Sequence, residues 1–127
     1  MITWSELSFY NFNNPPTKQI RRSPQTQNKY DIHKKNLKIN QSEHIKKNIL
    51  KENDFAYTQN SFPYETEKNI KHDIIWSKRD LSEADIREII IKHNQNMDIE
   101  KDCVYFINIK SNQSIPDITH AHVFIKS

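Results

Sequence analysis

The sequence predicts an α+β domain with a small, mostly antiparallel sheet. Three segments rich in β-branched and aromatic residues predict strands at 71–77, 102–109 and 119–126. A helical pattern from Asp80 to about His93 separates the first two strands, so the C-terminal half has the order β-α-β-β. Because helix signals dominate residues 1–50, we expect the N-terminal helices to pack on one face of this sheet.

The helices are predicted from their capping residues. Thr3 and Glu6 form a capping box that starts a short helix at Trp4. Ser23 is a suitable N-cap with Pro24 at the first helical position, which predicts a helix to about residue 39. Its expected apolar stripe is Tyr30, His33 and Leu37. A third helix is expected at 43–50, and a capping box of Ser82 and Asp85 starts the last one.

The length of 127 residues corresponds to one domain. We divide it into a helical part at 1–50, an irregular, aromatic-rich loop at 51–70 and a sheet part at 71–127. The absence of glycine excludes the glycine-dependent phosphate loops. Backbone positions with positive φ must then be filled by other residues, of which Asn tolerates this conformation well. The candidates are Asn13, Asn14, Asn40, Asn69, Asn94, Asn96 and Asn112.

Charge and composition limit the partners. The net charge of +3 is spread along the chain, which predicts a solvated surface with a weak preference for anions. A single cysteine, Cys103, excludes an internal disulfide and fits a reducing compartment. We see no apolar run of the ~20 residues that a membrane span needs, and no signal peptide. We therefore expect a cytoplasmic protein with no membrane partner.

The amino-acid composition also indicates the kind of genome that encodes the chain. Ile, Lys and Asn account for 48 of the 127 residues, a bias typical of AT-rich genomes such as those of some protists and large DNA viruses. A viral protein of this kind would act in the cytoplasm of its host.

The alternation of side chains divides the predicted sheet into two faces. One face gathers aliphatic residues, against which amphipathic helices should pack. The other gathers imidazoles, aromatic rings and an amide, which suits either a ligand surface or an ordinary half-covered sheet with hydrogen-bonded histidines. The aliphatic set is Ile75, Ile107, Ile109, Val123 and Ile125. The polar set is His72, Trp76, Phe106, Asn108, His120, His122 and Phe124.

Four separated pieces of the chain resemble the family of the fungal N-acetylglucosamine-induced protein. They are Trp4 with Glu6; Arg22-Ser23-Pro24 with Tyr30; Asn60-x-Phe62-Pro63-Tyr64 with Ile70-x-His72 and Trp76-Ser77-Lys78; and Phe106-x-Asn108 with Ser111-x-Gln113-Ser114 and His120-x-His122-Val123. The resemblance spans the whole chain and implies the fold and the polar positions of the site. This chain departs from the family pattern at Lys68-Asn69, where the family often has Pro-Gly, and in the loop from Lys51 to Tyr57.

The histidines leave several chemistries open. His120 and His122 lie on one strand face, about 6.5–7 Å apart, and with His72 they are a possible zinc set. No Cys or Asp completes that set, so we expect no metal and no cofactor. The segment also resembles a histidine-triad pattern in which Phe124 replaces the third histidine. Cys103 is predicted to be a plain core or edge cysteine.

We expect a small-molecule binding domain, with enzymatic activity left open, for a phosphorylated ligand such as a nucleotide or nucleotide sugar. Histidine is suited to acid–base catalysis at neutral pH, so His72, His120 and His122 are the candidates for that role. Phosphate would bind at the helix N-terminus formed by Arg22 and Ser23. The further ligand-binding candidates are Trp76, Lys78, Asn108, Gln113 and Ser114.

Two other functions remain as alternatives. The polar face is also compatible with a non-enzymatic module that contacts a protein partner. Single-stranded nucleic acid is a weaker option, because it would need stacking aromatic residues beside a continuous basic track. A ligand site requires Arg22 to lie beside the three histidines in a pocket, whereas an interaction module leaves a flat patch.

Overall fold

The computed structural model describes residues 1–127 and contains one four-stranded antiparallel sheet, in the order β1-β2-β4-β3. This confirms the α+β class and the mostly antiparallel sheet. The strands are β1 (Phe55–Gln59), β2 (Ile70–Ser77), β3 (Cys103–Phe106) and β4 (Thr119–Lys126). The helices are α1 (Trp4–Leu7), α2 (Pro24–Asn36), α3 (Gln41–Ile45), α4 (Glu83–His93) and α5 (Ile99–Asp102), with a π-helical turn at Lys46–Leu50 and a 3-10 turn at Lys110–Asn112.

The predicted caps start their helices as expected. Thr3 accepts a hydrogen bond from the backbone N–H of Glu6, whose carboxylate accepts one from the N–H of Thr3. Ser23 caps α2 with Pro24 in the first turn, and Ser82 with Asp85 caps α4. Each side chain satisfies a backbone donor that a helix leaves free at its N-terminus. Local sequence therefore determines where these helices begin.

The strand β1 corrects the prediction that residues 51–70 form an irregular loop. Phe55–Gln59 pairs with β2 over five residues, with Ala56 opposite Trp76 and Thr58 opposite Ile74. A strand of five residues with no strict alternation of polarity gives little local signal. It forms because it pairs with the edge of β2, and this pairing is a long-range interaction.

The C-terminal half follows the predicted β-α-β-β order. The strands β2 and β3 both pair antiparallel with β4, so they run parallel to each other with β4 between them. The helices α4 and α5 make the crossover between them. The strand β3 is shorter than expected because regular pairing stops at Phe106, and Ile107 to Ile109 continue as an irregular segment.

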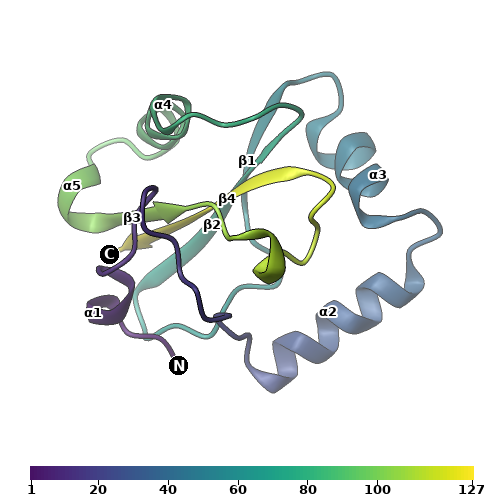
Figure 1. Cartoon of the computed structure of the whole chain (residues 1–127), viewed down its shortest axis with the longest axis horizontal. Coiled ribbons are helices and arrows are strands. Elements are labelled where there is room, and N and C mark those ends of the chain that lie inside the picture. The colour runs from purple at the N-terminus through teal and green to yellow at the C-terminus, as the bar shows by residue number, and fades with distance from the viewer.

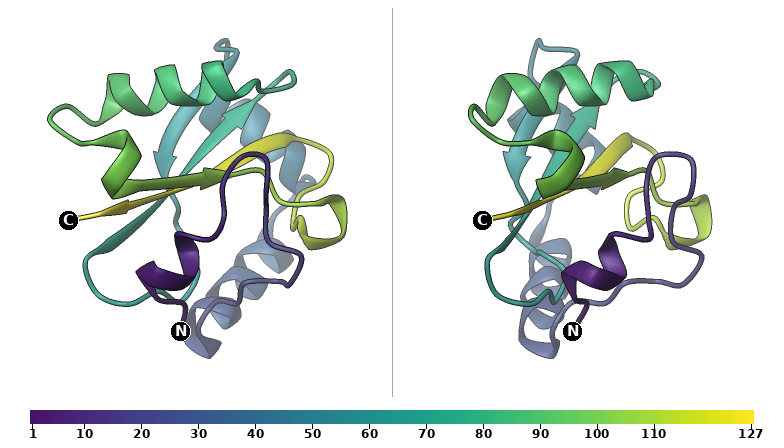
Figure 2. Two further views of the ribbon diagram at one scale, coloured as in Figure 1. Left: turned by 60° about the vertical axis from the view of Figure 1, so that its left-hand side comes forward. Right: turned by 90° about the vertical axis from the view of Figure 1, so that its left-hand side faces the viewer.

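One face of the sheet packs against α4, which lies across it in both views of Figure 2. Its core contains Ile75, Val123 and Ile125 from the strands, together with Ile86 and Ile90 from α4. These contacts confirm the predicted aliphatic face. Ile109 is the exception, since its side chain is 38% exposed beyond the end of β3.

The other face is covered by the N-terminal part of the chain, with α1 and α2 on the side of the sheet opposite α4 (Figures 1 and 2). Leu7 of α1 packs on Phe106 and Phe124, and Ile45 of α3 packs in a cluster with Ile74 and Trp76. The N-terminal helices thus share one face as predicted. It is the face of histidines and aromatic residues, however, and the aliphatic face packs against α4, with a smaller contribution from Ile99 of α5.

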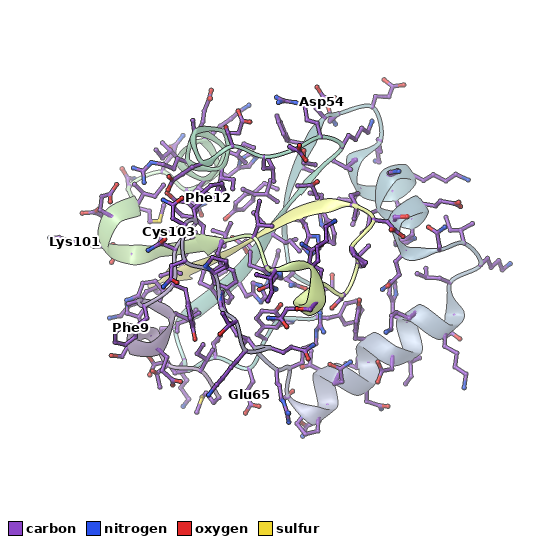
Figure 3. The ribbon with its side chains drawn as sticks, in the orientation of Figure 1. Phe9, Phe12, Asp54, Glu65, Lys101 and Cys103 are labelled. Carbon is purple, nitrogen blue, oxygen red and sulfur yellow. The ribbon has the colours of Figure 1, made fainter.

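The segment that follows α1 passes beside β3 and reaches the α4 side. Phe12 packs against the cluster that contains Cys103 and Ile90, and Figure 3 shows its side chain close to Cys103. Phe9, from the same segment, is 75% exposed. Burial raises the pKa of the Cys103 thiol to about 12, so this residue is a core cysteine, as predicted.

Three residues adopt positive φ in this chain without glycine: Lys51, Asn69 and Asn96. Two of them are among the seven predicted asparagines, and Lys51 was not predicted. The Lys78 ammonium donates a hydrogen bond to the Lys51 carbonyl and so helps to hold this turn.

None of the helices is both long and apolar enough to cross a bilayer.

Candidate functional site

A cavity of about 250 Å³ lies between the N-terminal helices and the histidine face of the sheet. In Figure 1, α2 and α3 form an arc beside β4. Residues of all three elements line the cavity. Its lining residues come from α2, α3, the π-helical turn, β1, β2, β4 and the segments that connect them, and none comes from α1, α4, α5 or β3. They are Arg22, Tyr30, His33, Leu37, Gln41, His44, Ile45, Ile49, Thr58, Gln59, Asn60, Ser61, Phe62, Ile74, Trp76, Ser114, Ile115, His120 and His122.

The only formal charge in this lining is the guanidinium of Arg22, and no Asp or Glu lines the cavity. The Arg22 Nε–H donates to the Phe62 carbonyl at 2.7 Å, and the guanidinium carbon lies 4.1 Å from the centre of the Tyr30 ring. No carboxylate lies within 4.0 Å of its nitrogens. Its terminal nitrogens therefore remain available to an anion.

The buried histidines His72 and His122 are hydrogen-bonded to each other, with His72 Nε2 2.9 Å from His122 Nδ1. The backbone N–H of Tyr64 can only donate, so at 3.1 Å it donates to His72 Nδ1. His72 must then carry its proton on Nε2 and donate it to His122 Nδ1. His122 in turn carries a proton on Nε2, which lies 3.4 Å from the Tyr64 hydroxyl. Both rings are neutral in this arrangement.

His120 is held differently and keeps one nitrogen free. Its Nδ1 lies 2.9 Å from the Ile118 carbonyl, which can only accept, so Nδ1 carries the proton. The lone pair of the neutral ring is then on Nε2, which has no partner within the protein. Of the three histidines predicted to act as acid or base, His120 is the one with an unoccupied ring nitrogen on the cavity.

Burial favours the neutral form of all three rings. Burial, and then the charge of Arg22, lowers the pKa of His72 to about 3. Burial holds the pKa of His122 well below its usual range, with further lowering by His72, His120 and Arg22. Burial also lowers the pKa of His120, against the opposing effect of its hydrogen bond to Ile118.

Trp76 forms part of the cavity wall beside His120, with ring centres 5.1 Å apart. The two residues are directly opposite each other on β2 and β4. Among side-chain nitrogens and oxygens with no access to solvent, Trp76 Nε1 is the one that has no hydrogen-bond partner. Buried polar groups in proteins are nearly always paired, so this indole N–H is a donor that the fold itself leaves unused.

The remaining predicted ligand-binding residues are divided between the cavity and its surroundings. Ser114 lines the cavity, whereas Asn108 and Gln113 do not belong to its lining. Asn108 donates to the Tyr64 hydroxyl at 2.9 Å, and Gln113 donates to the Asn108 carbonyl at 2.7 Å. Ser23 caps α2 and faces a second hollow, which His72 also lines. Lys78 lies after the end of β2 and contacts Lys51 rather than the cavity.

Sequence reasoning missed the contribution of the N-terminal helices to this cavity. His33 and His44 both line it, with ring centres 5.5 Å apart, and Phe62 packs against His33 and Tyr30 at 5.1 Å. The predicted stripe of Tyr30, His33 and Leu37 on α2 was the available signal, because it marked the inward side of that helix. All three residues of this predicted stripe line the cavity.

A metal ion is not favoured by the donor geometry. No group of three or more His, Cys, Asp or Glu side chains is arranged to hold one. His72 and His122 direct the nitrogens that a metal would need toward each other.

Comparisons with known proteins find a matching family, a related protein and a solved structure with a similar fold. A family model described as "Protein of unknown function (DUF3605)" matches residues 3–126. The "N-acetylglucosamine-induced protein 1" of Candida albicans is 35% identical over an alignment of 89 residues, with coverage of 58% of this chain and 35% of that protein. The chain spans about a third of the length of this relative. The crystal structure of HTC1 has a similar fold, with a TM-score of 0.66, 20% identity, and coverage of 100% of this chain and 86% of that one.

Proposed function

The chain belongs to the family described as "Protein of unknown function (DUF3605)", and from this premise we propose that its cavity binds a small phosphorylated molecule. The observation that carries the proposal is the unpaired charge of Arg22. It is the only charged side chain in a lining without carboxylates. A buried or half-buried guanidinium is normally paired, and a phosphate group would pair it through two parallel hydrogen bonds.

The size of the cavity favours the smaller members of this ligand class. Its volume of about 250 Å³ is just below the ~300–1,000 Å³ of sites for drug-sized ligands. We therefore favour a sugar phosphate or a nucleoside monophosphate over a larger nucleotide sugar. The neutral polar side chains Gln41, Gln59, Asn60 and Ser114 suit hydroxyl groups, and Trp76 supplies a stacking surface.

The N-terminus of α2 contributes less to the proposed phosphate site than the sequence predicts. The Ser23 hydroxyl accepts from the backbone N–H of Thr26 and donates to the Thr26 hydroxyl, so capping already occupies it. Arg22 precedes the cap and faces the main cavity. We assign phosphate binding to Arg22 and local helix capping to Ser23.

Any proton transfer at this site is assigned to His120. Both nitrogens of His72 and of His122 are engaged in the hydrogen-bond chain with Tyr64, whereas His120 Nε2 is free to accept a proton from a ligand. His72 and His122 would then act as positioning residues. The protein-interaction alternative has less support, because the exposed large apolar side chains lie on separate elements of the fold. Met1 and Phe9 flank α1, Ile32 lies on α2, Ile91 lies on α4, and Ile109 follows β3.

The test is a binding titration of the purified protein with orthophosphate, glucose 6-phosphate and uridine 5′-monophosphate, each compared with its unphosphorylated counterpart where one exists. We expect a phosphorylated compound to raise the melting temperature and the unphosphorylated one to do so less. Arg22→Gln should weaken its binding about 10- to 100-fold, since a hydrogen bond to a charged group contributes about 1.5–3 kcal/mol.

Arg21→Gln is the matched control, because it removes the same charge from an exposed neighbouring position. Binding by this variant should equal that of the wild type. Equal binding by the Arg22→Gln protein, or no binding of any of these compounds to the wild type, would contradict the proposal. Steep salt dependence shared by both variants would instead favour a nucleic-acid surface.

A further inference from the structure

We infer that His72 is a positioning residue that fixes the backbone segment from Asn60 to Tyr64 and, through that segment, the side chain of Arg22. The inference deepens the proposed function and rests on it, because Arg22 is the proposed phosphate-binding residue. His72 does not belong to the lining of the main cavity, so it acts on a ligand there only through other residues. This role differs from the acid–base role that the sequence predicts for His72.

The first observation is that both ends of this segment are hydrogen-bonded to His72. The backbone N–H of Asn60 donates to the His72 carbonyl at 3.0 Å, directly after the end of β1. Four residues later, the backbone N–H of Tyr64 donates to His72 Nδ1 at 3.1 Å. The rings of Tyr64 and His72 also pack together, with their centres 4.7 Å apart. One residue of β2 therefore holds the segment at its beginning and at its end.

The second observation is the constrained carbonyl of Phe62, in the middle of the segment. The Phe62 N–H donates to Asn60 Oδ1 at 2.8 Å, which forms a local turn. Pro63 follows, and a residue before proline is restricted to extended conformations. These constraints fix the Phe62 carbonyl, which accepts the hydrogen bond from Arg22 Nε–H at 2.7 Å.

The same segment also contacts Arg22 in other ways. The Tyr30 ring, over which the guanidinium carbon lies at 4.1 Å, packs against the Phe62 ring with the centres 5.1 Å apart. The backbone N–H of Glu65, the next residue along the chain, donates to the carbonyl of Arg21 at 3.0 Å. The position of the guanidinium therefore depends on the position of this segment.

His72 can hold the segment only as a neutral ring with its proton on Nε2. Its Nε2 lies 2.9 Å from His122 Nδ1, and this bond leaves Nδ1 as the acceptor for the Tyr64 N–H. Burial, and then the charge of Arg22, lowers the pKa of His72 to about 3, so the ring keeps this acceptor at neutral pH.

The experiment uses two substitutions that each keep one function of the His72 ring. In His72→Asn, the side-chain oxygen takes the place of Nδ1 and can accept from Tyr64, but the donor to His122 is lost. In His72→Gln, the longer side chain places its amide at the position of Nε2, so a donor to His122 remains and the acceptor for Tyr64 is lost. His93→Gln, at an exposed position of α4, is the matched control.

Calorimetric titration with orthophosphate, glucose 6-phosphate and uridine 5′-monophosphate measures the effect on binding. His72→Gln should weaken the binding of each compound that the wild type binds by about 3- to 10-fold, because Arg22 would have to be ordered on binding. His72→Asn and His93→Gln should bind as the wild type does. In the Arg22→Gln background, His72→Gln should cause no further loss, because both changes remove the same interaction.

Nuclear magnetic resonance gives a readout that general destabilisation would not move. The Arg22 Nε–H should exchange slowly with water in the wild type and in His72→Asn, and faster in His72→Gln, because its acceptor is then no longer fixed. In the wild type, the nitrogen spectrum should show that His72 Nδ1 carries no proton, and this test requires no substitution. Urea unfolding of each variant provides the check on folding.

The outcomes separate this inference from the proposal on which it rests. Wild-type binding by His72→Gln, equal losses in His72→Asn and His72→Gln, or a protonated His72 Nδ1 in the wild type overturns the positioning role and leaves the phosphate site intact. A loss that His72→Gln also causes in the Arg22→Gln background overturns it as well. Binding that is insensitive to Arg22→Gln, or the absence of binding of all three compounds, contradicts the phosphate site and the positioning role together.

Discussion

The two faces of the sheet differ in whether their buried polar groups have partners within the protein. On the α4 face, Asp73 is 1% exposed, accepts a hydrogen bond from the Tyr57 hydroxyl and pairs with the Lys71 ammonium at 3.2 Å. On the cavity face, Trp76 Nε1, His120 Nε2 and the charge of Arg22 have no partner. The comparison supports the proposal that the cavity face retains polar groups for a ligand at some cost in stability, whereas the polar groups of the α4 face stabilise the fold.

The polar network on the α4 face gives the largest expected effect. Asp73→Ala would remove the charged acceptor shared by the Tyr57 hydroxyl and the partly exposed Lys71 ammonium. At about 1.5–3 kcal/mol for a hydrogen bond to a charged group, the free energy of unfolding should fall by about 4 kcal/mol. Urea denaturation measures this change. Asp54→Ala, at an exposed carboxylate labelled in Figure 3, is the control and should change stability by less than about 0.5 kcal/mol. A similar small effect for Asp73→Ala would remove the contrast between the faces.

The aliphatic packing of the same face gives the next effect. Ile86 on α4 is fully buried, so Ile86→Ala should lower the free energy of unfolding by about 3 kcal/mol through lost burial and a residual cavity. Ile91 on the same helix is 52% exposed, and Ile91→Ala should change stability little. Ligand binding should be the same in both folded variants, because α4 contributes no residue to the cavity. A loss of binding in the Ile86→Ala protein would show that the two faces are coupled.

The histidines of the cavity face give a smaller effect that depends on pH. The folded-state pKa of His72 is about 3, below the ordinary value of 6.5, so between these values the unfolded state binds the proton and the folded state does not. The free energy of unfolding therefore falls as the pH is lowered from about 6.5 toward 3, by up to about 1.4 kcal/mol per pH unit for this group.

In His72→Gln, the free energy of unfolding should fall less steeply as the pH is lowered, because unfolding takes up about one proton fewer. Denaturation midpoints measured from pH 7 to pH 4 give the slope for the wild type and the variant. His93→Gln, at an exposed position of α4, serves as the control and should retain the wild-type slope. An unchanged slope in His72→Gln would mean that His72 is not the neutral, buried ring that connects Tyr64 and His122.

Residues with a local signal were predicted well, and those positioned by distant segments were not. The capping residues Thr3, Ser23 and Ser82, the strands β2 and β4, and the alternation that gathers His72, His120 and His122 all follow from neighbours in the sequence. The strand β1 was missed because it depends on pairing with β2. His33 and His44 were missed because only the fold of the N-terminal helices brings them to the sheet.

The sequence by itself determined the class, the order of the C-terminal elements and the content of the polar face, because side-chain periodicity and capping are local physical requirements. Only the tertiary structure decided which polar atoms have partners. His72 and His122 satisfy each other, whereas His120 and Trp76 retain a free acceptor and a free donor. The direction of these hydrogen bonds depends on distances between residues that are 50 and 58 positions apart in the sequence, which no local pattern specifies.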